Sequence, residues 1–269
     1  MGTSKDYEAP PQWGPIKRDV TNSAGAGFLT PQKAAHIVSS FVGKMQTSGI
    51  GGFRGATAAP ADSSTSPAST RRRGGTRRGG GRHRSLSRGG GAPAVARAFG
   101  SFLSDVAKRG LAQALAEAGI ISVEGLTVEE IALALADALG GPASTVDDVD
   151  LRNALSALID EITTEAKTVK DVEGAFSSAA ANLEGIIEQL FSYYIYERFC
   201  TTMYAGLAER HGVTTADNYL AQIKDYIDGQ LALEAATRDL TSVDWAGDEG
   251  ASIVDEILDS TIEVFSVPA

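Results

Sequence analysis

From Pro93 onward, apolar residues recur along the chain at intervals of three and four residues. This spacing places them on one face of an α-helix. Signals for the ends of helices agree with this spacing. Thr127 and Glu130 have the spacing of a capping box at a helix start, and Gly119 and Gly140 follow apolar runs, as glycines at helix ends do. We therefore predict helices over about 93–118, 127–139, 146–162, 182–211, 215–237 and 249–265.

The segment 182–211 has the strongest helical pattern in the chain. Gly212 follows it as a C-terminal cap, with Arg210 and His211 in the last turn, where cations are favoured. Its main apolar face comprises Leu183, Ile186, Ile187, Leu190, Phe191, Tyr194, Phe199, Met203 and Leu207. Further apolar residues lie off that face, namely Tyr193, Ile195 and Tyr196. We expect this helix to be central and contacted on several sides.

Three places leave the helical pattern incomplete. Gly110 weakens the predicted helix over 93–118 by about 1 kcal/mol relative to Ala. Residues 168–181 either extend the following helix or connect to it. Residues 239–248 break the pattern, and we expect Trp245 within them to fold back onto the core.

No segment shows sustained strand alternation bounded by hairpin turns. Residues 92–267 are therefore predicted to form one all-α domain of about six helices, long enough for a core of its own.

The first seventy residues read as a long, largely disordered, low-complexity tail with a short helix at 30–46, capped by Thr30. Residues 1–29 are interpreted as a frayed, Pro- and Gly-rich tail. The alternative is a tail that a partner enzyme binds, with Trp13 as its anchor. Residues 48–70 have too few large apolar groups to offset the entropy of ordering.

Charge divides the chain sharply. Residues 1–70 carry a net charge of +2, residues 71–110 carry +10, and residues 111–269 carry −22, with seven basic and 29 acidic side chains in the last segment. The stretch 71–91 contains eight glycines and eight arginines: Arg71, Arg72, Arg73, Arg77, Arg78, Arg82, Arg84 and Arg88. Such a stretch is typical of nucleic-acid contact through phosphates. The alternative is a basic hinge that lies against acidic surface. No aromatic side chain stands between 54 and 98 to stack on bases.

The remaining residue types argue against an enzyme. The single cysteine, Cys200, excludes an internal disulfide framework and fits the reducing cytoplasm. One cysteine and three scattered histidines argue against a zinc site, and GGTRRGGGRH is not a phosphate-binding loop. Acidic pairs such as Asp147-Asp148 sit at helix starts, where the helix dipole explains them as solvated surface. We therefore predict no catalytic residue, no metal and no cofactor, and we find no secretory signal and no run of apolar residues that spans a membrane.

Four stretches carry a resemblance to a known family: AVARAFGSFLSDVAKRGLAQALAEAGI, LALADALGGPASTVDDVDLRNALSALIDEI, FSYYIYERF and SVDWAGDEG. Together with the Met-Gly-Thr-Ser start and the Arg/Gly-rich junction, they resemble the B component (QatB) of Qat anti-phage defence systems. The resemblance covers the start of the chain and nearly all of 85–267.

The resemblance implies a QueC-like partner enzyme (QatC), together with the ATPase (QatA) and the TatD-like nuclease (QatD) of the same system. It further implies that the QueC-like enzyme attaches a 7-deazaguanine-type group to the N-terminal glycine, which is Gly2 here once Met1 is removed. Thr3, Ser4 and Trp13 are then the expected partner contacts in the tail.

Two functions are thus expected from the sequence. The first is a non-enzymatic helical adaptor in anti-phage defence, with its N-terminal tail as the substrate of a partner enzyme. The alternative is a nucleic-acid-binding module that acts through the eight arginines. In the first function, residues 71–91 are a charged hinge between the tail and the acidic domain.

Overall fold

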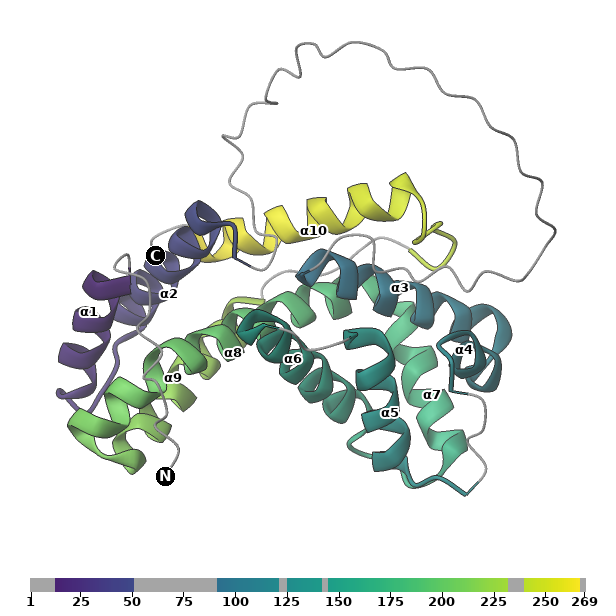
Figure 1. Ribbon diagram of the computed structural model, residues 1–269, viewed down its shortest axis with the longest axis horizontal. Helices are drawn as coiled ribbons and strands as arrows, with labels where there is room; N and C mark the ends of the chain where they lie inside the picture. The colour runs from purple at the N-terminus through teal and green to yellow at the C-terminus, as the bar shows by residue number, and fades with distance from the viewer. Residues whose placement is uncertain (1–12, 51–90, 121–124, 142–144, 232–239, 267–269) are drawn as a thin grey trace, which may run out of the picture.

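The computed structural model describes residues 13–50, 91–120, 125–141, 145–231 and 240–266 (Figure 1). Within these ranges the chain is helical and contains no β-strand, which confirms the predicted all-α class. The helices are α1 (Gly14–Ala24), α2 (Pro31–Ser48), α3 (Ala92–Arg109), α4 (Leu111–Glu117), α5 (Val128–Gly140), α6 (Val146–Thr163), α7 (Val169–Ala181), α8 (Leu183–His211), α9 (Val213–Leu231) and α10 (Asp248–Ser266).

The described residues thus hold ten helices, and eight of them follow residue 91, where about six were predicted, so the predicted number was too low. One reason is Gly110, which separates α3 from α4 within the helix expected over 93–118. The φ angle of Gly110 is +82°, a backbone conformation that glycine adopts readily and that residues with a side chain rarely adopt. The peptide direction changes there, and the helix cannot continue.

The other helix beyond the predicted number is α7. The sequence indicated only that residues 168–181 either extend the following helix or connect to it. The side chain of Thr168 accepts from the backbone N–H of Asp171, and the Asp171 carboxylate accepts in return from the backbone N–H of Thr168. This capping box satisfies N–H groups that the first turn leaves unpaired. Val172 and Phe176 on the inner face of α7 are fully buried. Asn182 has a non-helical backbone, with φ −121° and ψ 44°, and therefore separates α7 from α8.

Helix α8 is the centre of the arrangement, as its sequence predicted. It packs against α1, α3, α6, α7, α9 and α10. In Figure 1, α8 and α9 lead from the group α3–α7 to the side of the molecule where α1 and α2 lie. Tyr194 and Ile195 are adjacent in sequence and therefore point to different sides of α8, and both are buried. A helix that is apolar on several sides requires neighbours on several sides.

Trp13 and α1 are packed into the helical body, so the interpretation of residues 1–29 as a frayed tail is wrong for Trp13 and the residues of α1. The Trp13 ring is buried with its centroid 4.8 Å from that of Phe41 in α2. Phe41 in turn lies 5.1 Å from Phe199 of α8, in an edge-to-face arrangement. Helix α1 packs on α2, α8 and α9, and α2 packs on α9 and α10.

Helix α2 confirms the short helix predicted over 30–46, including its cap at Thr30. Helix α1 was missed, although its signal was present. Its buried positions are three and four residues apart: Trp13, Ile16, Val20 and Ala24. The Pro- and Gly-rich composition around this stripe concealed it, and the folded body therefore includes α1 and α2 as well as the helices after residue 91.

Trp245 folds back onto α3, as expected. Its side chain is buried, and its indole Nε1 donates a hydrogen bond of 2.8 Å to the hydroxyl of Ser104. Gly100, one turn earlier on α3, provides the space. A Cβ at Gly100 would lie 2.7 Å from the indole ring, which is closer than carbon atoms approach without repulsion. This contact ties the segment before α10 to the core.

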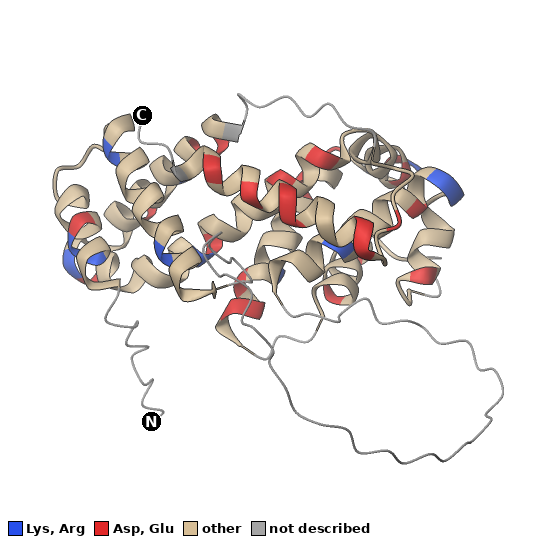
Figure 2. Ribbon diagram, turned by 90° about the horizontal axis from the view of Figure 1, so that it is seen from above, with Lys and Arg blue, Asp and Glu red and all other residues tan. Residues whose placement is uncertain are grey.

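Acidic residues are spread over the face that includes α10, as Figure 2 shows. On α10 the buried residues Val254, Ile257 and Ile262 face the core, whereas Asp255 and Asp259 are exposed. The −22 charge of residues 111–269 is thus partly displayed on this surface.

Candidate functional site

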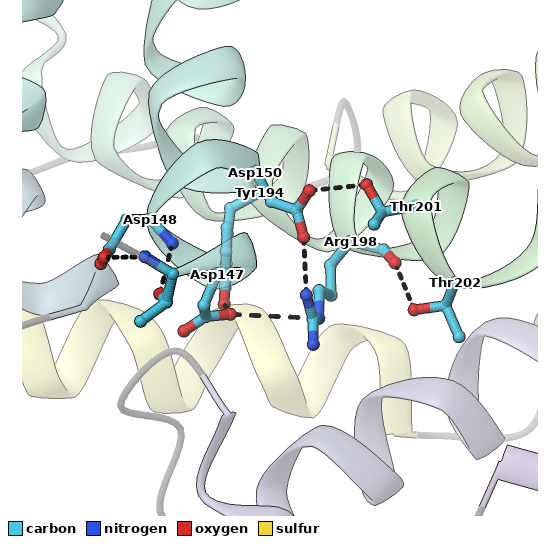
Figure 3. A network of polar contacts seen from close by, with 8 residues as sticks. Asp147, Asp148, Asp150, Tyr194, Arg198, Thr201 and Thr202 are labelled. Carbon is cyan, nitrogen blue, oxygen red and sulfur yellow. Dashed lines mark hydrogen bonds and ion pairs between the residues drawn. The ribbon is translucent and has the colours of Figure 1, made fainter. Parts of the chain in front are cut away.

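A buried polar network joins α6 to α8 (Figure 3). Arg198 of α8 donates from Nη1 to Oδ2 of Asp150 in α6 at 2.8 Å. Asp150 is 1% exposed and Arg198 is 5% exposed. Thr201, one turn further along α8, donates from its hydroxyl to the other carboxylate oxygen of Asp150 at 2.6 Å. Both oxygens of the buried carboxylate are therefore hydrogen-bonded.

Asp147 extends the network toward the start of α6. The hydroxyl of Tyr194 donates to Oδ1 of Asp147, and Nε of Arg198 lies 3.9 Å from the same oxygen. Asp148, by contrast, forms the capping box with Thr145. The interpretation of the pair Asp147-Asp148 as a solvated helix start is thus correct for the cap at Asp148. It is wrong for Asp147, which the fold places against α8.

The electrostatics of the network follow from its burial. Burial raises the pKa of Asp150, and the hydrogen bonds from Arg198 and Thr201 oppose that rise. Burial alone would lower the pKa of Arg198, but its hydrogen bond to Asp150 and the two carboxylates outweigh this, so its pKa is raised. Burial also raises the pKa of the Tyr194 hydroxyl, which stays protonated at neutral pH and acts as a donor. At neutral pH Arg198 is therefore charged and Tyr194 is neutral, and their contacts with Asp150 and Asp147 link α8 to α6.

Cys200 lies beside this network on α8 and carries a free thiol. Burial raises its pKa to about 12, so the thiol is protonated at neutral pH. Because the thiolate is the nucleophile, this cysteine is poorly suited to covalent catalysis. Within the ranges that the structure describes, no three His, Cys, Asp or Glu side chains gather in a way that could hold a metal ion.

Of the predicted site residues, the structure describes Trp13 and leaves the others outside its described ranges. Gly2, Thr3 and Ser4 lie outside the described residues, as do the arginines Arg71, Arg72, Arg73, Arg77, Arg78, Arg82, Arg84 and Arg88. Trp13 is described and is 1% exposed. Its ring is therefore committed to the core formed with α2 and α8, and it anchors the tail to its own domain rather than offering surface to a partner.

The network itself was not predicted from the sequence, although a signal existed. Asp147 and Asp150 are three residues apart, which places them on one face of α6. Tyr194, Arg198 and Thr201 follow one another at intervals of four and three on α8. Two polar stripes of similar spacing, each beside the buried apolar residues of its helix, indicate a buried contact.

Comparison with models of known protein families finds one matching family. The family model described as Qat anti-phage system associated protein QatB matches residues 80–265. The chain belongs to the QatB family. No curated protein and no solved structure matches it. As a QatB-family member, the chain is a component of an anti-phage defence system.

The QatB match covers α3 to α9 and nearly all of α10, and therefore includes the network around Arg198. Helices α1 and α2 precede it. Among the described helices of this QatB-family chain, none combines the length and the apolar character that crossing a membrane requires.

Proposed function

We propose that this QatB-family chain is a non-enzymatic adaptor of a cytoplasmic anti-phage system, with an N-terminal tail that a QueC-like partner enzyme (QatC) binds and modifies at Gly2. The modification is a 7-deazaguanine-type group on the N-terminal glycine. The resemblance stated above supports this reading, and so does membership of the QatB family. The ATPase (QatA) and the TatD-like nuclease (QatD) are the further partners of the same proposal.

The observation that carries the proposal is the anchoring of the chain at Trp13. The ring is buried against Phe41 of α2, so the twelve residues that precede it in sequence are attached to a fixed point of the helical body. Twelve extended residues span up to about 40 Å. Gly2 can therefore enter an active site on a partner while the helical body stays outside it.

The chemistry of Gly2 suits this role once Met1 has been removed. An α-amino group has a pKa of about 8, so an appreciable fraction is unprotonated and nucleophilic at neutral pH. Glycine has no side chain to obstruct a narrow pocket, and Thr3 and Ser4 add small hydrogen-bonding groups behind it.

We expect the intact mass of the protein to increase when it is co-expressed with its QueC-like partner, and to remain that of the unmodified chain without it. Gly2→Leu should abolish the increase, because a bulky second residue retains Met1 and no glycine amine is exposed. Ser177→Ala, at an exposed position of α7, is the control and should be modified like the wild type. An unchanged N-terminus together with no co-purification would rule the proposal out.

A second candidate, nucleic-acid binding, is supported by the net +10 charge of residues 71–110. Of the cations in that segment that the structure describes, Arg109 is already paired with Asp105 at 2.6 Å and with Glu117 at 3.1 Å. The acidic surface over α10 repels phosphates. Contact with nucleic acid would therefore depend on the eight arginines from Arg71 to Arg88.

Replacing those eight arginines by serine should weaken binding to a single-stranded oligonucleotide and flatten its salt dependence. Each lost phosphate contact lowers the slope of log K against log salt by about 0.7. The double variant Lys108→Ser/Arg109→Ser is the control, and its slope should match the wild type. Binding that is identical in the eightfold variant and the wild type would eliminate this candidate.

A further inference from the structure

A groove with a volume of about 520 Å³ runs along the seam between α1 and α8, next to the point where the first twelve residues join the body. Its apolar lining is provided by the exposed ring of Pro15 at the start of α1, with Val20 of α1 and Met203 and Leu207 of α8 beneath the surface. Gly14 and Gly206 lie on its two walls, and a Cβ built on either would meet no atom within 4 Å. The groove is therefore open, and side chains of the chain itself leave it unfilled in the described structure.

Three cations line this groove: Lys17, Arg18 and Arg210. In the described ranges, no ion pair joins any of them to a carboxylate. Asp19 and Glu209 are exposed neighbours in sequence, but neither lines the groove. Arg210 is moreover one of only seven basic residues among residues 111–269, which carry 29 acidic ones. An apolar floor with a cationic rim fits an acidic peptide segment that has a large apolar side chain.

We propose that this groove binds residues 6–9 of the same chain, Asp6-Tyr7-Glu8-Ala9. In an extended segment, alternate side chains point to opposite sides. Tyr7 then faces the apolar floor, while Asp6 and Glu8 face the cations on the rim. The segment thus matches the groove in both charge and apolar character.

The dimensions of the groove agree with this occupant. On α1 the lining extends from Gly14 to Thr21, which corresponds to about 10 Å of helix. About three to four extended residues cover that length. Pro10, Pro11 and Gln12 connect the segment to Trp13 and allow the chain to reverse direction beside the start of α1. The occupant is therefore long enough to fill the groove and is tethered at its end.

The far end of the groove is closed by a contact between α8 and α1. His211 Nε2 lies 3.0 Å from the carbonyl oxygen of Thr21, and a Cβ on Gly25 would lie 3.2 Å from the His211 ring. A tail bound along the groove leaves residues 1–5 beside this end of α8. The groove then determines from which side of the body Gly2 is presented. This inference goes beyond the proposed function and does not depend on it, since tail binding requires no modification of Gly2.

Cleavage by chymotrypsin after Tyr7 in the full-length protein tests the proposal. We expect the wild type to be cut about tenfold more slowly than Gly206→Phe, because a tethered segment at millimolar effective concentration occupies even a weak site most of the time. In Gly206→Phe the new ring fills the groove. The control is Gly229→Phe on α9, where a Cβ also meets no atom within 4 Å, and it should be cut at the wild-type rate.

Arg210→Glu supplies an independent test that leaves the shape of the groove unchanged. Reversal of this charge repels Asp6 and Glu8, so cleavage after Tyr7 should accelerate there as well. Equal unfolding midpoints for the variants and the wild type exclude a general loss of structure as the cause.

The proposal is overturned if all variants and the wild type are cut at the same rate. Protection that increases with protein concentration would place the tail of a second copy in the groove and would also overturn it. Equal cleavage rates combined with loss of oligonucleotide binding in Gly206→Phe would assign the groove to phosphate instead of to the tail.

Discussion

Arg198→Met is expected to lower the free energy of unfolding by about 3–5 kcal/mol at neutral pH, the range observed when one member of a buried ion pair is removed. The substitution leaves the carboxylate of Asp150 without its cation at a position that is 1% exposed. Unfolding in urea, followed by circular dichroism, measures the change. Asp228→Asn removes the exposed carboxylate of an ion pair with Lys224 within α9 and serves as the control, with an expected change within about 0.5 kcal/mol.

The loss in Arg198→Met should depend on pH in a defined direction. Burial already raises the pKa of Asp150 in the folded protein, and Arg198 is the group that opposes this rise most strongly. A carboxyl group with a folded pKa above its unfolded value binds protons preferentially in the folded state. Stability is then lost as the pH rises through the folded pKa and regained as the pH falls. The variant should therefore recover part of its stability as the pH falls from neutral toward the unfolded-state pKa of about 4.

A double variant distinguishes two causes of the lost stability in Arg198→Met, namely an unpaired buried charge and lost packing. In Asp150→Leu/Arg198→Met both charges are replaced by apolar groups, so no buried carboxylate remains without a partner. We expect this protein to be more stable than Arg198→Met alone. If the double variant is equally unstable at every pH, lost packing rather than an uncompensated charge accounts for the effect.

Trp13→Ala is expected to lower the free energy of unfolding by about 3–5 kcal/mol, the usual cost of removing a buried aromatic ring. The ring is 1% exposed and contacts Phe41, which connects it to α8. The fluorescence of Trp245, which is then the remaining tryptophan, reports on unfolding at the opposite side of the core. Phe28→Ala is the matched control, because Phe28 is 69% exposed and its removal should change stability by less than about 0.5 kcal/mol.

This variant also tests whether α1 and α2 unfold together with the rest of the body. If they do, the transition reported by Trp245 shifts to lower urea in Trp13→Ala. A transition at the wild-type midpoint would show that residues 13–50 form an independent unit. The anchoring of the tail, and with it the argument for presenting Gly2, would then lose its structural basis.

The helices after residue 91 could largely be predicted because each carries its own signal. The stripe of α6 (Leu151, Leu155, Leu158, Ile159) is buried as expected, and the capping residues Thr127 and Thr145 begin α5 and α6. Periodicity and capping are local properties, so they can be read from a few turns of sequence. The backbone conformation of Gly110 is also local, but a single glycine within an apolar stripe is compatible with either a weakened or a broken helix.

Local periodicity and capping could not establish where α1 packs. Nor could they establish the partners of Asp147, Asp150 and Arg198. Each depends on contacts between residues far apart in the chain, such as Trp13 with Phe41 and Phe41 with Phe199. The composition around Trp13 resembles that of a disordered tail, and only the surface offered by α2 and α8 makes burial of its stripe favourable.

The sequence by itself determined the all-α class, the central role of α8, the separation of charge between 71–110 and 111–269, and the resemblance to the QatB family. These follow from residue type, spacing and local order. Only the packing of the helices showed that Trp13 and α1 belong to the folded body, that Arg198 pairs with Asp150, and that a cationic groove lies between α1 and α8. Burial and the pairing of charges depend on which surfaces meet, and that is fixed only when helices distant in sequence pack together.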